Sequence, residues 1–138
     1  MSRASGSDDT ARFAADLISA TTPSLSTEES AALAALPASS ALLIVHRGPG
    51  LGSRYLLDQD VTVAGRHPDA DIFLDDVTVS RRHAEFRRVD GGFEVVDLGS
   101  MNGTYVEGER VDRQRLVNGL EVMVGKFHLT FYSSARDR

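Results

Sequence analysis

One short stretch of this sequence, TVSRRHAEF (78–86), carries a serine hydroxyl, two guanidinium groups and an imidazole side by side. An ordinary β-strand alternates apolar and polar residues and does not place three nitrogen-rich side chains in succession. Gly65-Arg66 lies upstream of this stretch, and Asn102-Gly103-Thr104 lies downstream of it. Hydroxyl, guanidinium and amide groups are donors that suit a multiply charged anion, and a phosphate monoester can use several of them at once.

A phosphate monoester carries about −1.5 to −2 charges and three strong acceptor oxygens, so a site for such an anion needs charge-assisted donors in fixed directions. Arg66, at the end of a predicted strand, can offer a bidentate fork, and Arg81 can add a second cation. Ser80 can supply its hydroxyl and its backbone N–H. The Asn102 amide has both a donor and an acceptor, which suits the main chain of an extended peptide. Each residue taken singly is also compatible with ordinary surface polarity.

The composition of the 138-residue chain argues against several other classes of protein. The formal net charge of −5 argues against general nucleic-acid binding, which needs a net basic face. The absence of cysteine excludes disulfide scaffolds, thiolate zinc sites and cysteine nucleophiles. His67 and His128 lack partners at metal-ligand spacing, and Asp75-Asp76 are adjacent, so neither set predicts a metal centre or an acid–base pair. We therefore expect no enzyme activity, no catalytic residues, no metal and no cofactor.

Targeting and membrane signals are also missing from the sequence. The N-terminus MSRASGSDDTARF has no apolar core of the kind found in signal peptides. No run approaches the roughly 18 apolar residues that span a bilayer. The arginine pairs of SRR and FRR lack the aromatic interleaving of a nucleic-acid patch. The sequence therefore predicts a cytoplasmic protein that binds neither membrane nor nucleic acid.

The elements that must position these residues begin at Ala41, where short alternating runs predict an all-β sandwich. Turn signals such as GPGLG, HPDAD and DGG divide the runs at intervals of roughly ten residues. The predicted strands are residues 41–47, 53–58, 61–65, 71–74, 83–89, 93–98, 104–106, 120–125 and 127–133. In this arrangement Arg66 follows a strand and Ser80 lies in a loop.

The first 40 residues differ from the rest, because they are rich in Ala, Ser, Thr, Asp and Glu and almost lack β-branched apolar residues. This composition predicts a flexible and mostly disordered regulatory tail over 1–40. Within it, residues 27–36 predict a short helix that is marginal unless it docks. Ser26 is its predicted N-cap, and Glu29 completes a capping box. Residues 134–138 predict a disordered C-terminus.

Three phrases, GRHPDADIFLDDVTVSRRHAEF, LGSMNGTYV and LVNGLEVMVGKFHLTF, resemble the forkhead-associated (FHA) domain, and the resemblance covers about residues 41–133. The FHA signature of Gly-Arg, Ser-x-x-His and Asn-Gly-Thr is matched in order. The resemblance implies a β-sandwich of about eleven strands that binds phosphothreonine peptides with the loops at one end. The phosphothreonine-binding residues that it implies are Arg66, Ser80, Arg81 and Asn102. Those implied as structural support of the site are Gly65, His83, Gly103 and Thr104.

Residues 40–86 further resemble an actinobacterial family, the glycogen accumulation regulators or oxoglutarate dehydrogenase inhibitors. The resemblance implies non-catalytic control of 2-oxoglutarate and glutamate metabolism. Unphosphorylated members bind the 2-oxoglutarate dehydrogenase complex and glutamate dehydrogenase. A Ser/Thr protein kinase phosphorylates a tail threonine, the FHA domain then binds its own phosphothreonine, and the enzymes are released. The alternative is a generic FHA adaptor that recruits a phosphorylated partner, such as a kinase, in Ser/Thr kinase signalling.

The tail motif of that family, Glu-Thr-Thr-Ser-Val-Phe-Arg-Ala-Asp, aligns with DDTARFAAD (8–16) and places Thr10 on the second threonine. Thr10 is therefore the predicted phosphorylation site. About 30 residues separate Thr10 from Ala41, and a flexible chain of that length spans roughly 30 Å root-mean-square, so self-binding is within reach. The positions that depart from the motif, and that leave the choice of kinase open, are Ala11, Arg12 and Ala14. The weaker candidate phosphorylation sites are Thr21, Thr22 and Thr27.

Overall fold

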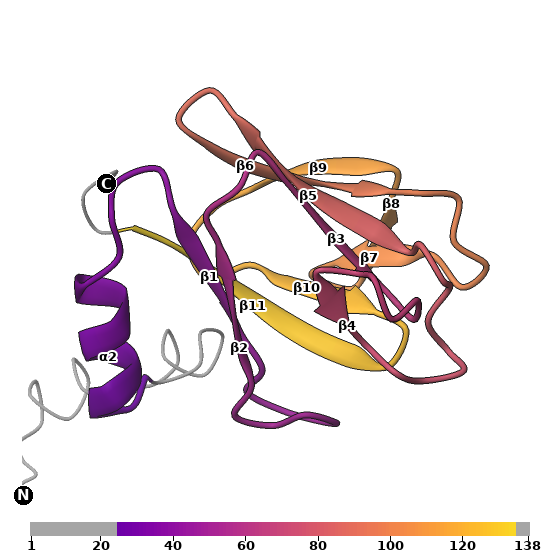
Figure 1. Ribbon diagram of the computed structural model, residues 1–138, viewed down its shortest axis with the longest axis horizontal. Coiled ribbons are helices and arrows are strands. Elements are labelled where there is room, and N and C mark those ends of the chain that lie inside the picture. The colour runs from indigo at the N-terminus through magenta and orange to yellow at the C-terminus, as the bar shows by residue number, and fades with distance from the viewer. Residues whose placement is uncertain (1–24, 135–138) are drawn as a thin grey trace, which may run out of the picture.

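The computed structural model describes residues 25–134, and short runs of residues between turns form eleven strands in this part of the chain (Figure 1). In chain order the strands are β1 (Ala41–Ile44), β2 (Arg54–Leu57), β3 (Val61–Gly65), β4 (Ile72–Phe73), β5 (Ala84–Val89), β6 (Gly92–Asp97), β7 (Thr104–Val106), β8 (Glu109–Val111), β9 (Arg113–Leu116), β10 (Glu121–Val124) and β11 (Phe127–Ser133). Within the same described residues, helix α2 (Thr27–Ala34) precedes the strands. The predicted all-β fold of about eleven strands is confirmed.

The strands form two sheets that face each other. One sheet has six strands in the order β2-β1-β11-β10-β7-β8, and the other has five in the order β4-β3-β5-β6-β9. The β3–β4 pair is parallel, and the other pairs are antiparallel. The loops that join β4 to β5 and β6 to β7 lie together at the right-hand end of the sandwich in Figure 1.

The core between the two sheets is apolar and well buried. Phe86, Phe93 and Phe131 are its largest fully buried side chains. The rings of Phe93 and Phe131 meet edge to face across the sheets, with their centroids 6.1 Å apart, the geometry that aromatic pairs prefer. This packing gives the loops at the end of the sandwich a rigid base.

Two strands, β8 and β9, were not predicted from the sequence. Their residues are mostly polar and exposed: β8 reads ERV and β9 reads RQRL, with Leu116 as the one buried residue of the two strands. Such strands carry no apolar alternation by which sequence reasoning could detect them. A turn at Glu107-Gly108 joins β7 to β8.

Helix α2 lies on the outer face of the six-stranded sheet, away from the loops at the other end of the molecule (Figure 1). It starts with the predicted capping box: Ser26 Oγ accepts the Glu29 N–H at 3.0 Å, and Glu29 Oε1 accepts the Ser26 N–H at 2.9 Å. Leu33 and Leu36 pack on a strip formed by Leu42, Ile44 and Tyr132.

Ser134, which follows β11, fixes this packing. Ser134 is fully buried, its hydroxyl donates to Leu36 O at 3.0 Å, and its N–H donates to Ser40 O at 3.1 Å. Residues 25–40 are therefore packed against the sandwich, so the predicted boundary at residue 41 falls inside this packed unit. Residues 1–24 and 135–138, including Thr10, lie outside the described residues. Within residues 25–134, no helix is long and apolar enough to cross a membrane.

Candidate functional site

The four predicted phosphate-binding residues come from three segments that meet at one end of the sandwich. Arg66 follows β3, Ser80 and Arg81 lie in the β4–β5 loop, and Asn102 lies in the β6–β7 loop. The Arg66 N–H donates to Ser80 O at 3.0 Å, which joins the first segment to the second. The Met101 N–H donates to Ser80 Oγ at 3.0 Å, which joins the second to the third. The structure thus brings together residues that are up to 36 positions apart in the sequence.

Several donors of these residues are already engaged within the protein. Arg66 Nε donates to Val79 O at 3.1 Å, which directs the guanidinium and leaves its terminal nitrogens for a ligand. Asn102 Nδ2 donates to Thr78 O at 2.8 Å, which leaves its carbonyl oxygen and a second N–H. Ser80 Oγ accepts one hydrogen bond and keeps its own proton. The three side chains are therefore oriented before any ligand arrives.

One expectation about Ser80 needs correction. Its backbone N–H was expected to reach the ligand, but it donates to His83 Nδ1 at 3.1 Å. Ser80 therefore contributes only its hydroxyl in this structure.

His83 is fully buried and links the two loops of the site. Its Nδ1 accepts the Ser80 N–H, and its Nε2 lies 2.8 Å from Gly103 O. Because a carbonyl oxygen can only accept, Nε2 carries the proton and the ring is neutral. The backbone of His83 also holds neighbouring segments, since its N–H donates to Ala64 O and its carbonyl accepts the Leu98 N–H.

Asp97, which sequence reasoning missed, holds the β6–β7 loop in shape. Its two oxygens accept the hydroxyls of Ser100 (2.6 Å) and Thr104 (2.7 Å) and the backbone N–H groups of Gly99 and Ser100. Burial alone would raise the pKa of Asp97, but these hydrogen bonds outweigh it and the pKa is lowered. An aspartate followed by Gly and Ser two and three positions later is the sequence signal for such a turn.

The predicted supporting residues of the β6–β7 loop contact this turn. Thr104 is fully buried, as expected for a residue whose hydroxyl binds Asp97. Gly103 has a φ of 85°, a conformation that favours glycine. Its N–H donates to Ser100 Oγ at 2.9 Å, which closes the turn that presents Asn102.

Asp76 and Lys126, also missed, fix the other side of the β4–β5 loop. Asp76 accepts hydrogen bonds from the N–H and the hydroxyl of Thr78, and Lys126 Nζ lies 2.9 Å from its second oxygen. The Lys126 N–H donates to Thr78 Oγ1 at 3.1 Å. The Thr78 hydroxyl and then Lys126 lower the pKa of Asp76 to about 2. Asp76 is thus a loop-shaping carboxylate.

The low pKa of Asp76 predicts a pH dependence of stability. The folded pKa of about 2 lies below the ordinary value of 3.8, so this stabilisation is present above about pH 4 and is lost as the pH falls towards 2. We expect the wild type to be more stable than Asp76→Asn at neutral pH, and the gap between their urea midpoints to shrink below about pH 4. An equal gap at pH 7 and pH 2 would contradict this assignment.

Gly65 allows the first and second segments to approach closely. A Cβ at this position would lie 2.1 Å from Arg81 O, which is backbone and cannot move aside cheaply. We expect Gly65→Ala to lower the free energy of unfolding by about 1–3 kcal/mol, measured by urea denaturation, and to weaken ligand binding at the same time. Gly92→Ala is the matched control, because its Cβ would meet only the end of the flexible Arg115 side chain. Equal losses in the two variants would count against the close approach.

The surface around the site is basic and partly apolar, although the chain as a whole is acidic. Arg66, Arg81 and Arg82 are exposed there. Val77 and Met101, each 86% exposed, belong to the same two loops. Among the described residues, no group of three or more His, Asp or Glu could hold a metal ion. The arrangement is therefore suited to binding a peptide that carries an anionic group.

Comparison with known proteins finds a matching family model and several relatives that are similar in sequence. A family model described as the FHA domain matches residues 62–125. The glycogen accumulation regulator GarA of Mycolicibacterium smegmatis is 65% identical over 101 residues, which cover 73% of this chain and 64% of that relative. The oxoglutarate dehydrogenase inhibitor of Corynebacterium efficiens is 57% identical over 122 residues, which cover 88% of this chain and 86% of the relative. This chain thus spans less than two thirds of the mycobacterial relative and most of the corynebacterial one.

A solved structure is also similar to this chain. It comes from a structural and functional analysis of phosphothreonine-dependent FHA domain interactions, has a TM-score of 0.62 and 32% sequence identity, and covers 67% of this chain and 95% of that one. The likeness therefore extends over the sandwich that carries the site.

Proposed function

Because this chain belongs to the FHA-domain family, we propose that it is a non-catalytic regulatory protein that binds phosphothreonine peptides through Arg66, Ser80, Arg81 and Asn102. The observation that carries the proposal is the convergence of these residues from three segments hydrogen-bonded to one another. A phosphate monoester dianion would meet two guanidinium groups and a serine hydroxyl, while Asn102 holds the peptide main chain. Gly65, His83, Gly103 and Thr104 would fix the loops.

The names of the relatives guide the choice of partner. Since one relative is an oxoglutarate dehydrogenase inhibitor and another a glycogen accumulation regulator, we propose that the unphosphorylated chain binds the 2-oxoglutarate dehydrogenase complex in the cytoplasm. Glutamate dehydrogenase is a second proposed target. The exposed Val77 and Met101 beside the arginines offer the apolar contacts that an unphosphorylated surface needs.

Regulation of this binding would come from the tail. We propose that a Ser/Thr protein kinase phosphorylates Thr10, and that the site then binds its own phosphothreonine and releases the target enzyme. The competing role is that of an adaptor whose site recruits a phosphorylated partner, such as the kinase itself. In the switch, phosphorylation of this chain fills the site with its own tail, whereas in the adaptor the site stays open for a phosphorylated partner.

The test uses the full chain before and after phosphorylation by a Ser/Thr kinase. We expect a single phosphate on Thr10, concentration-independent shifts of the Ser80, Arg81 and Asn102 amide resonances, and inhibition of 2-oxoglutarate dehydrogenase by the unphosphorylated chain alone. Thr10→Ala is the control, and it should inhibit the enzyme with or without the kinase. If these amide resonances do not shift after phosphorylation, the switch is contradicted. The adaptor role is then favoured if a phosphorylated partner binds to the site.

A further inference from the structure

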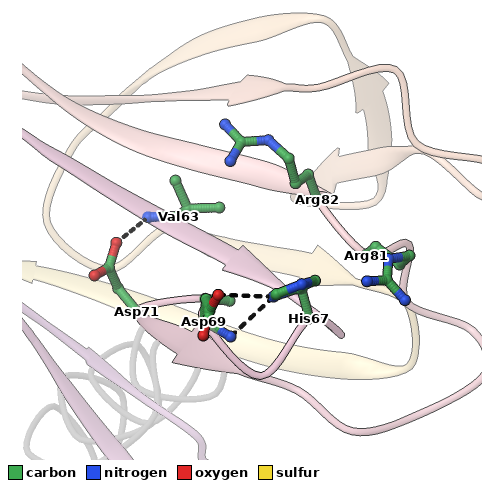
Figure 2. Close-up of a pocket in the computed structure, with 7 residues that line it drawn as sticks. Val63, His67, Asp69, Asp71, Arg81 and Arg82 are labelled. Atoms are coloured by element: carbon green, nitrogen blue, oxygen red, sulfur yellow. Dashed lines mark hydrogen bonds and ion pairs between the residues drawn. The ribbon is translucent and has the colours of Figure 1, made fainter.

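A pocket of about 330 Å³ adjoins the proposed phosphate site on the side of β3 and the β3–β4 loop (Figure 2). The side chains of its lining that matter here are Arg81, Arg82, His67, Asp69 and Asp71. Arg81 belongs both to the pocket and to the proposed phosphate site, since it follows Ser80 directly. The pocket therefore continues the phosphate site rather than forming a separate one.

The wall of this pocket next to Ser80 is cationic. Within residues 25–134, neither the Arg81 nor the Arg82 guanidinium has a hydrogen bond or an ion pair with another side chain, and Figure 2 shows the two side chains extending in different directions from neighbouring positions. The Asp69 N–H donates to His67 Nδ1 at 3.0 Å. This bond puts the proton of a neutral ring on Nε2, so His67 adds a further donor.

The pocket is also lined by two acidic residues, of which Asp69 adjoins His67. Asp71 accepts the Val63 N–H at 2.9 Å and so fastens the β3–β4 loop to β3. Asp69 is exposed and lies 3.7 Å from His67 Nδ1. The basic wall of the pocket is thus the part nearest the proposed phosphate position.

We propose that Arg82, with Arg81 and His67, forms a second anion subsite, which takes the carboxylate of a residue two positions before the phosphothreonine. The proposal rests on the proposed function, because the phosphothreonine sets the register of the peptide. Arg82 lies two residues after Ser80, a separation of about 7 Å at most. In an extended peptide, side chains two positions apart lie on the same face and are separated by about the same distance.

The tail of this chain supplies such a residue. Asp8 lies two positions before Thr10, and Asp9 lies between them. The side chain of Asp8 would share a face with the phosphate, whereas that of Asp9 would point the opposite way. On the other side of Thr10 the equivalent position is Arg12, a cation that Arg82 would repel. Charge and spacing therefore both place Asp8 on the basic wall.

The test measures coupling by titration calorimetry at low salt. The full unphosphorylated chain is titrated with a peptide of residues 4–16 phosphorylated at Thr10, and with versions carrying Asp8→Asn or Asp9→Asn. We expect Asp8→Asn to weaken binding to the wild-type chain by about three- to fivefold, the upper part of the range for an exposed ion pair, and to have almost no effect on binding to Arg82→Gln. Asp9→Asn should change binding to both proteins equally.

Arg113→Gln is the matched protein control, because Arg113, on β9, pairs with Glu94 of β6. It should respond to Asp8→Asn as the wild type does. An equal effect of Asp8→Asn on wild type and Arg82→Gln overturns the subsite while leaving the proposed function intact. If the phosphopeptide fails to bind the wild-type chain at all, the proposed function fails and the subsite fails with it.

Discussion

Replacement of Arg66 by alanine should lower the affinity for a phosphothreonine peptide by about 30-fold or more. The guanidinium is held by its Nε bond to Val79 O, so its terminal nitrogens face the ligand side in a fixed orientation. Loss of a charge-assisted, bidentate contact of this kind corresponds to about 2–4 kcal/mol. Titration calorimetry with the phosphorylated peptide of residues 4–16 measures the change directly.

Two further variants separate charge from geometry at this position. Arg66→Lys keeps the cation but loses the planar fork, so its affinity should lie between those of the wild type and Arg66→Ala. Arg54→Ala removes an exposed arginine from β2 and should leave the affinity within about twofold. A loss below threefold for Arg66→Ala would show that Arg66 is not the main phosphate ligand.

Replacement of His83 by alanine should lower the free energy of unfolding by about 3–5 kcal/mol. The variant opens a cavity at a fully buried position and also leaves the Ser80 N–H and Gly103 O without their partner. A loss of this size is a large share of the total stability of a domain. Urea denaturation followed by circular dichroism measures it.

His67→Ala is the matched control, since the His67 side chain is partly exposed and, among residues 25–134, its hydrogen bond and ion pair are to Asp69 in its own turn. Its stability should change by less than about 0.5 kcal/mol. His83→Ala should also weaken phosphopeptide binding at temperatures where it remains folded, because the two loops that His83 joins lose their mutual position. Wild-type stability in His83→Ala would contradict the linking role of the imidazole.

The sequence predicted the parts of the molecule that depend on local spacing. The apolar alternation in β3 and β11 gave their bounds correctly, and the capping box of α2 was recognised because its two residues are three positions apart. The order of Gly65-Arg66, Ser80 to His83 and Asn102-Gly103-Thr104 also predicted which residues the structure would bring to one end.

Features that depend on distant contacts could not be predicted in this way. Lys126 is 50 positions from Asp76, and nothing in either neighbourhood indicates their pairing. The engagement of the Ser80 N–H with His83 depends on the path of the loop between them. The strands β8 and β9 were not predicted because a polar edge strand is stabilised by pairing with its neighbour and has no apolar pattern of its own.

The docking of α2 changes the geometry of the proposed self-binding. With Leu33 and Leu36 packed on the sheet, only about 15 residues separate Thr10 from the anchored chain at Leu25, half the length counted to Ala41. A random coil of that length spans roughly 20 Å, close to the roughly 23 Å that the seven residues of β11 cover between the two ends of the sandwich. A tether whose root-mean-square length matches the distance that it must span gives the highest local concentration of the group that it carries. In the proposed switch, the helix would thereby anchor the tail and favour binding of a molecule's own phosphothreonine over that of a neighbouring molecule.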